Sequence, residues 1–108
     1  MNEASIKQSV SELKDMLSNR YGNGIGIYIF GSAARGDYRK DSDIDVLVLF
    51  PGPVDTDLKE EIIDLAFDIE LENNVIFGIV VRSSDYWASE KAAVTPFHQN
   101  VVREAMRI

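Results

Sequence analysis

The stretch from Ile29 to Phe50 decides the fold, and it reads IFGSAARGDYRKDSDIDVLVLF. It sets a glycine-serine turn, two arginines and several aspartates between two runs of strand-forming residues. The second run, Ile44–Phe50, is almost continuously apolar, which is typical of a strand covered on both faces. Asp43 and Asp45 nevertheless stand at the head of that strand, where charge is least expected.

Asp43 and Asp45 are two residues apart. Successive side chains of a strand point to opposite faces, so both carboxylates should share one face. Two like charges that converge among apolar side chains are costly to bury without a partner. A cation removes this conflict, and Mg²⁺ takes hard oxygen ligands together with phosphates and water. The pair therefore predicts a magnesium site that works with a nucleoside triphosphate (NTP).

The glycine-serine turn directly follows the first strand. Gly31 allows the backbone to turn sharply and to approach a ligand, and Ser32 is expected to cap a short helix. Backbone N–H groups at such a point favour phosphate. Arg35, Arg39 and Lys40 follow on the same loop and are suited to phosphate oxygens. We therefore expect this loop to face the triphosphate.

Taken together, these residues resemble the minimal nucleotidyltransferases of the DNA polymerase beta superfamily. The signature of that family is Gly-Ser, a short arginine-bearing turn and Asp-x-Asp. The matching positions are Gly31, Ser32, Arg35, Gly36, Ser42, Asp43 and Asp45. The tail FHQNVVREAMRI is also similar to the tails of small stand-alone members, so the resemblance covers nearly the whole chain.

The resemblance implies a nucleotidyltransferase fold and a role for six residues. The residues expected to bind the NTP phosphates are Gly31, Ser32, Arg35 and Ser42. Those expected to be catalytic, and to bind two magnesium ions, are Asp43 and Asp45. The implied reaction transfers a nucleoside monophosphate to a hydroxyl group, and the expected donor is ATP, which gives AMP. Small family members are often paired with a helical protein of HEPN type as antitoxins, so that protein is the expected partner.

Active members of the family carry a third carboxylate on the strand after the second long helix. The corresponding strand is predicted at residues 74–81 and contains no acid. Three acids lie just upstream, on the expected end of the helix: Asp68, Glu70 and Glu72. Whether one of them takes the third place stays open at this point. So do two functions: a magnesium-dependent nucleotidyltransferase, and a weak or inactive antitoxin or binding module of the same fold. A protein that senses NTP without chemistry is a further alternative.

Hydrophobic periodicity outlines the rest of the chain. Apolar residues at helical spacing predict two long helices, at residues 3–20 and 57–71. Runs of β-branched and aromatic residues predict strands at 25–30, 44–50 and 74–81. The fold class is therefore α/β, or α+β, with a small mixed sheet of three strands or slightly more that is flanked by helices.

The last quarter of the chain reads as helical. Residues 83–93 are expected to form a short helix that is capped by Ser83 or Ser84. Helical spacing resumes at Phe97 and continues to Ile108. No repeat or linker divides the sequence, and we expect residues 1–108 to form a single nucleotidyltransferase domain.

Composition limits the setting and the partners. The chain of 108 residues has no cysteine, which favours a reducing compartment, so we expect a cytoplasmic protein. No apolar run is long enough to span a bilayer, and no membrane partner is expected. The net charge of −7, from 18 acidic and 11 basic side chains, disfavours nucleic acid and suits a basic protein partner. An oligomer is compatible with this composition.

Overall fold

The computed structural model describes residues 3–39 and 42–108. Lys40, one of the three basic residues expected to face phosphate, lies outside these ranges. None of the helices within the described ranges is long and apolar enough to cross a membrane. The elements in chain order are α1 (Glu3–Tyr21), β1 (Gly26–Phe30), α2 (Gly31–Arg35), β2 (Ile44–Phe50), α3 (Thr56–Asn73), β3 (Phe77–Ser83), α4 (Ser84–Trp87), α5 (Glu90–Ala93), α6 (Pro96–Glu104) and β4 (Met106–Arg107).

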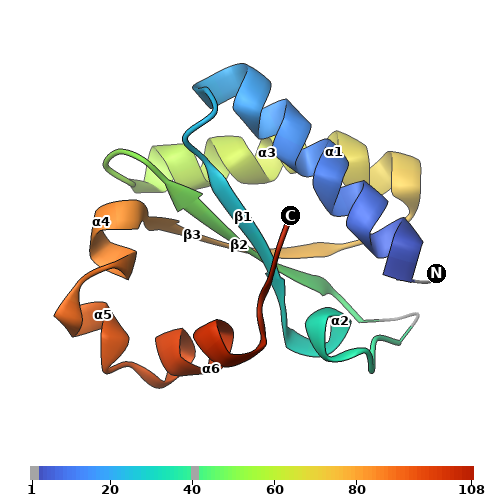
Figure 1. The fold of residues 1–108 in the computed structure, drawn as a ribbon. Helices are drawn as coiled ribbons and strands as arrows, with labels where there is room; N and C mark the ends of the chain where they lie inside the picture. Colours follow the sequence, from blue (N-terminus) through green and yellow to red (C-terminus); the bar gives the residue numbers. More distant parts are fainter. Residues whose placement is uncertain (1–2, 40–41) are drawn as a thin grey trace.

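The described strands form one mixed sheet in the order β3-β2-β1-β4. β1 pairs antiparallel with β2 and β4, whereas β2 pairs parallel with β3. A parallel pair needs a long crossover connection, and α3 provides it. Figure 1 shows α1 and α3 on one face of the sheet, with α4 and α6 on the other. The expected mixed sheet flanked by helices is therefore confirmed.

The centre of the core lies on β2. Ile44, Val46 and Val48 belong to the buried cluster under α1 and α3, where they meet the apolar side of α1. Leu47 is 1% exposed but points the other way, into the layer that contains Trp87 of α4. Both faces of β2 are thus covered, as its apolar sequence predicts. A polar side chain on this strand has to be placed at its end, and Asp45 is.

The C-terminal segment differs from the prediction. α6 ends at Glu104, and the next residues leave helical spacing to form β4, which pairs Met106 with Ile29 of β1. Ile108 N donates to Ile27 O at 2.9 Å, which extends this pairing. The reason is the open edge of β1, whose backbone groups need partners that a continued helix would not supply. The predicted helix through Ile108 is wrong in its last residues.

Two further boundaries are corrected. The predicted helix over residues 83–93 is split into α4 and α5, because Ser89 accepts a hydrogen bond from Ala92 N at 3.2 Å and caps a new helix. Ser83, one of the two predicted caps, does cap α4 by accepting from Tyr86 N at 3.1 Å. β3 starts at Phe77, three residues later than predicted, because α3 continues to Asn73.

Candidate active site

β2 brings the paired carboxylates to the sheet face opposite α1 and α3. Asp45 alternates with Ile44 and Val46, which are buried under those helices, so its side chain points to the other face. Asp43 lies just before β2 and is exposed. Burial raises the pKa of the Asp45 carboxyl, and the nearby charge of Asp43 raises it further. The structure thus places two mutually repelling carboxylates at one point.

Two glycines make room for Asp45. A Cβ atom on Gly31 would lie 2.2 Å from Asp45 Oδ2, and a Cβ atom on Gly78 would lie 2.9 Å from Asp45 Oδ1. Gly78 is the direct neighbour of Asp45 in the β2–β3 register, while Gly31 follows Phe30, its neighbour in β1. Gly31 also has a φ of +70°, which side-chain-bearing residues rarely adopt. The carboxylate therefore fits only because both neighbours lack a side chain.

The turn at Gly31 is capped differently from the prediction. α2 begins at Gly31 with Phe30 at its N-cap position, and no side chain of α2 caps it. Ser32 lies inside the first turn, so its predicted capping role is wrong. Instead, Glu104 Oε1, from the last residue of α6, accepts a hydrogen bond from Gly31 N at 3.1 Å. Ser32 remains a predicted phosphate ligand next to Gly31.

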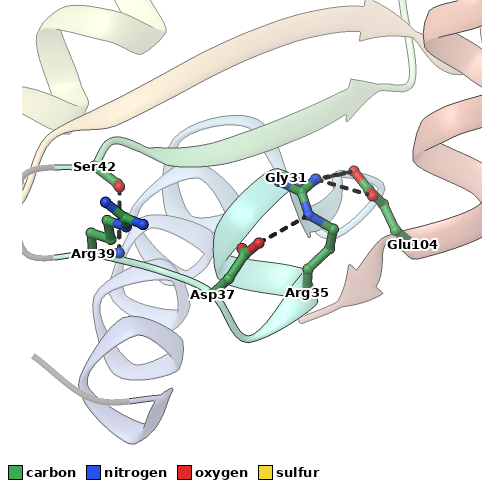
Figure 2. Close-up of polar contacts among 6 residues, drawn as sticks. All are labelled: Gly31, Arg35, Asp37, Arg39, Ser42 and Glu104. Carbon is green, nitrogen blue, oxygen red and sulfur yellow. Dashed lines mark hydrogen bonds and ion pairs between the residues drawn. The ribbon is translucent and has the colours of Figure 1, made fainter.

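Arg35 lies beside this turn and is held by two carboxylates (Figure 2). Its Nη1 atom is 3.3 Å from Glu104 Oε2, and its Nε atom is 3.6 Å from Asp37 Oδ2. The hydrogen bond to Glu104 and the charge of Asp37 raise the pKa of Arg35, which stays protonated. A permanent cation therefore stands next to Gly31, as phosphate binding requires.

Ser42 is set apart from this group. Its Oγ atom accepts a hydrogen bond from Arg39 N at 3.4 Å, and Figure 2 shows the pair away from Gly31 and Glu104. Ser42 lines a cleft of about 590 Å³ between the start of α1 and the turn after α3. Asp43 and Asp45 are not among the residues that line this cleft. The cleft is large enough for a ligand, but we place the site at Asp43 and Asp45 because the charges of Arg35 and Glu104 also act there.

The open question about the third carboxylate is answered by α3. Asp68, Glu70 and Glu72 all lie on this helix, which packs on the face opposite Asp45. Glu70 Oε2 is already engaged and accepts from Phe77 N at 3.1 Å. The charges that act on the Asp45 carboxyl come from Asp43, Arg35 and Glu104. None of the three upstream acids is brought to the site, and β3 offers glycine beside Asp45.

The two carboxylates of the site are few for a metal site, but they suit a hard cation. In residues 3–39 and 42–108, no three His, Cys, Asp or Glu side chains are grouped to hold a metal ion. Asp43 and Asp45 offer carboxylate oxygens whose mutual repulsion a divalent cation would relieve. Mg²⁺ is often bound by one or two carboxylates and completes its shell with phosphate and water. The residues present therefore fit magnesium that arrives with a nucleotide.

Sequence reasoning overlooked Glu104. A signal was available, because a negatively charged glutamate is unfavourable in the last turn of a helix, where the helix dipole is negative, unless another group binds its carboxylate. The Arg-Glu pair of the tail was part of the family resemblance, but it gave no hint that Glu104 would meet Gly31 across more than 70 residues of chain.

Comparison with known proteins agrees with this geometry. The model of the family described as "Nucleotidyltransferase domain" matches residues 10–107. The chain is 37% identical over 102 residues, 94% of its length and 92% of the relative, to a Methanocaldococcus jannaschii protein named "Putative protein adenylyltransferase MJ0604". A second protein of that organism, named "Putative protein adenylyltransferase MJ0141", is 29% identical over 70% of this chain and 74% of its own length.

Two solved structures are also similar. One, described as "Structure of putative minimal nucleotidyltransferase", aligns with a TM-score of 0.62 at 26% identity, over 100% of this chain and 97% of its own. Another, described as "Crystal structure of the toxin-antitoxin with AMP-PNP", has a TM-score of 0.58 at 20% identity, over 99% of this chain and 72% of its own, and shares the fold. The sequence signature, the fold and the family match agree, and the chain belongs to the nucleotidyltransferase domain family, in its minimal form.

Proposed function

We propose that this protein is a magnesium-dependent nucleotidyltransferase that moves AMP from ATP to a hydroxyl group of a protein partner in a toxin-antitoxin pair. The observation that carries the proposal is the placement of Asp43 and Asp45 beside Gly31 and Arg35. Carboxylates for the metal and donors for the phosphates thus lie within one small region. The name of the M. jannaschii relative, a protein adenylyltransferase, supports AMP as the transferred group.

The reaction divides the work between donors and carboxylates. The acceptor oxygen forms a bond to the α-phosphorus of ATP, and the bond from that phosphorus to the bridging oxygen breaks. Pyrophosphate leaves with the electron pair, and the hydroxyl proton passes to solvent. Gly31 N–H and Arg35, which face Glu104 in the structure, would hold the phosphates, and Asp43 and Asp45 would hold magnesium. When bound, magnesium supplies positive charge that stabilises the phosphate oxygens.

The surface of α3 supports a basic protein as the partner. Three of its apolar side chains recur every four residues and are 50%, 56% and 65% exposed, namely Ile63, Phe67 and Leu71. Its acids outnumber its single lysine, Lys59; they are Asp57, Glu60, Glu61, Asp64, Asp68, Glu70 and Glu72. α3 therefore carries most of the net charge of −7. Apposing two copies of this helix would bring like charges together, whereas a helical HEPN-type protein with a basic rim would complement it.

The proposed reaction is tested with a helical HEPN-type protein that forms a complex with this chain, to be sought among the products of neighbouring reading frames. ATP labelled at the α-phosphorus should transfer its label to that protein in the presence of Mg²⁺, and chelation of the metal should stop the transfer. ATP labelled at the γ-phosphorus should leave the partner unlabelled, which separates AMP transfer from phosphorylation. Absence of α-label transfer with the authentic partner and metal present would refute the proposed reaction.

A second candidate is an antitoxin of the same fold that binds without chemistry. The specific observation in its favour is β3, which contains no acid and places Gly78 beside Asp45. In that case Asp43→Asn and Asp45→Asn should leave neutralisation of the toxin intact. If these variants still form the complex but no longer neutralise, the second candidate is wrong.

The partner surface makes a separate prediction. Phe67→Ala should raise the Kd of the complex about 30-fold, because a central exposed aromatic side chain contributes about 2 kcal/mol to binding. The control is Val102→Ala on α6, since Val102 is 65% exposed, comparable to the 56% of Phe67, but α6 lies on the other face of the sheet from α3. Titration calorimetry with the partner gives both values. An equal effect of the two substitutions would show that the α3 surface is not the docking face.

A further inference from the structure

Glu104 joins the two groups of the site that are suited to phosphate (Figure 2). Its Oε1 atom accepts from Gly31 N at 3.1 Å, and its two oxygens lie 3.4 Å and 3.3 Å from Arg35 Nη1. We propose that Glu104 is a positioning residue that acts as an internal anion: it holds Gly31 N–H and Arg35 in the nucleotide-free protein and yields both to the triphosphate. The inference rests on the nucleotide site of the proposed function, but not on its chemistry.

The position of Glu104 is explained by these contacts and not by its own helix. It is the last residue of α6, where the carbonyl end of the helix disfavours a negative charge. Its side chain is only 17% exposed, so the carboxylate has lost most of its water. A carboxylate that is largely shielded from water needs charged or N–H donors as partners. Gly31 and Arg35 are those donors, and both are groups that a phosphate oxygen would use in the same way.

The charge of Glu104 opposes an incoming nucleotide. It acts on the Asp45 carboxyl together with Asp43, and both raise the pKa of Asp45 by repulsion, whereas Arg35 lowers it. A triphosphate adds several negative charges to this region and needs the Arg35 cation that Glu104 holds. Release of Glu104 from Arg35 is therefore part of the free energy of nucleotide binding. A neutral residue at position 104 should remove that cost.

Glu104 can yield without disturbing the fold around it. Two residues after it, β4 begins and pairs Met106 with Ile29. Phe97 of the same helix packs edge-on against the Phe30 ring, with the ring centroids 5.5 Å apart. These contacts fix the backbone of the segment on β1. The glutamate side chain has three rotatable bonds beyond this backbone, so the carboxylate can turn away while the strand stays paired.

The experiment compares the wild type with Glu104→Gln by titration calorimetry, using Mg²⁺ with AMP-PNP as one probe and inorganic tripolyphosphate as the other. Glutamine keeps an oxygen that accepts from Gly31 N but has no charge. The variant should bind both probes with a Kd roughly five- to tenfold lower, because a nearby negative charge is gone. The control is Glu60→Gln on the exposed surface of α3, which makes the same change in net charge and should leave both constants unchanged.

The outcomes distinguish failure of the inference from failure of the proposed function. An unchanged or weaker affinity of Glu104→Gln, at an unchanged melting temperature, overturns the inference and leaves the nucleotide site standing. Tighter binding of the variant supports it, also if the wild type binds neither probe. If neither protein binds either probe, the inference and the nucleotide site are both wrong. If Glu104→Gln binds the probes more tightly but the α-label assay shows no AMP transfer to the partner, the proposed reaction is refuted and the inference stands. Glu104→Ala, which also removes the acceptor for Gly31 N, should lower the melting temperature where Gln does not.

Discussion

Asp45→Asn should raise the melting temperature of the free protein and, at the same time, strongly reduce the rate of AMP transfer. The amide fits the same space between Gly31 and Gly78 but carries no charge. Burial and the charge of Asp43 both act against the ionised carboxyl, as its raised pKa shows, so its neutral replacement relieves repulsion. The loss of a magnesium ligand should lower the rate of transfer about 100-fold or more, since metal charge supplies several kcal/mol.

The two effects of Asp45→Asn have opposite signs, which makes them easy to distinguish from general damage. Asp15→Asn, an exposed change on α1, is the matched control and should alter neither quantity. Thermal unfolding and the α-label assay provide the measurements. A variant that is less stable than the wild type would show that the Asp45 charge does not destabilise the free protein. A variant that transfers AMP at the normal rate would show that the charge is not needed for the reaction.

Gly31→Ala should remove nucleotide binding and destabilise the fold by more than backbone strain alone. A residue with a side chain at the Gly31 φ of +70° costs about 1–2 kcal/mol. The new Cβ atom would also lie 2.2 Å from Asp45 Oδ2, so the carboxylate has to leave its place. Urea unfolding measures the first effect, and titration with Mg²⁺ and AMP-PNP measures the second.

The control for Gly31→Ala is provided by Gly36. Gly36 has a φ of +83°, and nothing lies within 4 Å of a Cβ atom added to it. Gly36→Ala therefore reports strain without collision. Asp45→Ala removes the colliding oxygen and leaves only the Cβ atom of residue 45, which is 3.4 Å from a Cβ atom added to Gly31. In that background the cost of Gly31→Ala should fall to that of Gly36→Ala. If it does not fall, Asp45 is not what Gly31 makes room for.

Most of the fold could be predicted from the sequence, because the local pattern of apolar residues in the long helices and in β2 matches the faces that these elements bury in the structure. The apolar run of β2 is read as a central strand, and it pairs on both sides. The spacing of apolar residues in α1 and α3 matches the sides they bury. The Gly31 turn and the Asp43–Asp45 pair were predictable too, because each depends on residues close together in sequence. Whether these residues perform the proposed chemistry stays a prediction.

The features that escaped prediction depend on residues far apart in the chain. β4 has only two residues, and Met106 and Arg107 have no strand pattern of their own. They form a strand because they pair with the exposed edge of β1. Glu104 was predictable only as a helix residue, because its partner Gly31 lies 73 residues earlier in the chain. Gly78 reads as a flexible residue within an apolar run, and only the β2–β3 register reveals that it faces Asp45.

The short β4 has a consequence for motion in the molecule. The β2–β3 ladder joins seven residue pairs, whereas β1 and β4 join two. Local unfolding therefore opens the β4 end at a much smaller free energy than it opens the ladder in the centre. Glu104 lies at the end of α6, two residues before β4. An opening of β4 therefore gives its carboxylate a second way to leave Gly31 and Arg35, besides the rotation of its own side chain while the strand stays paired.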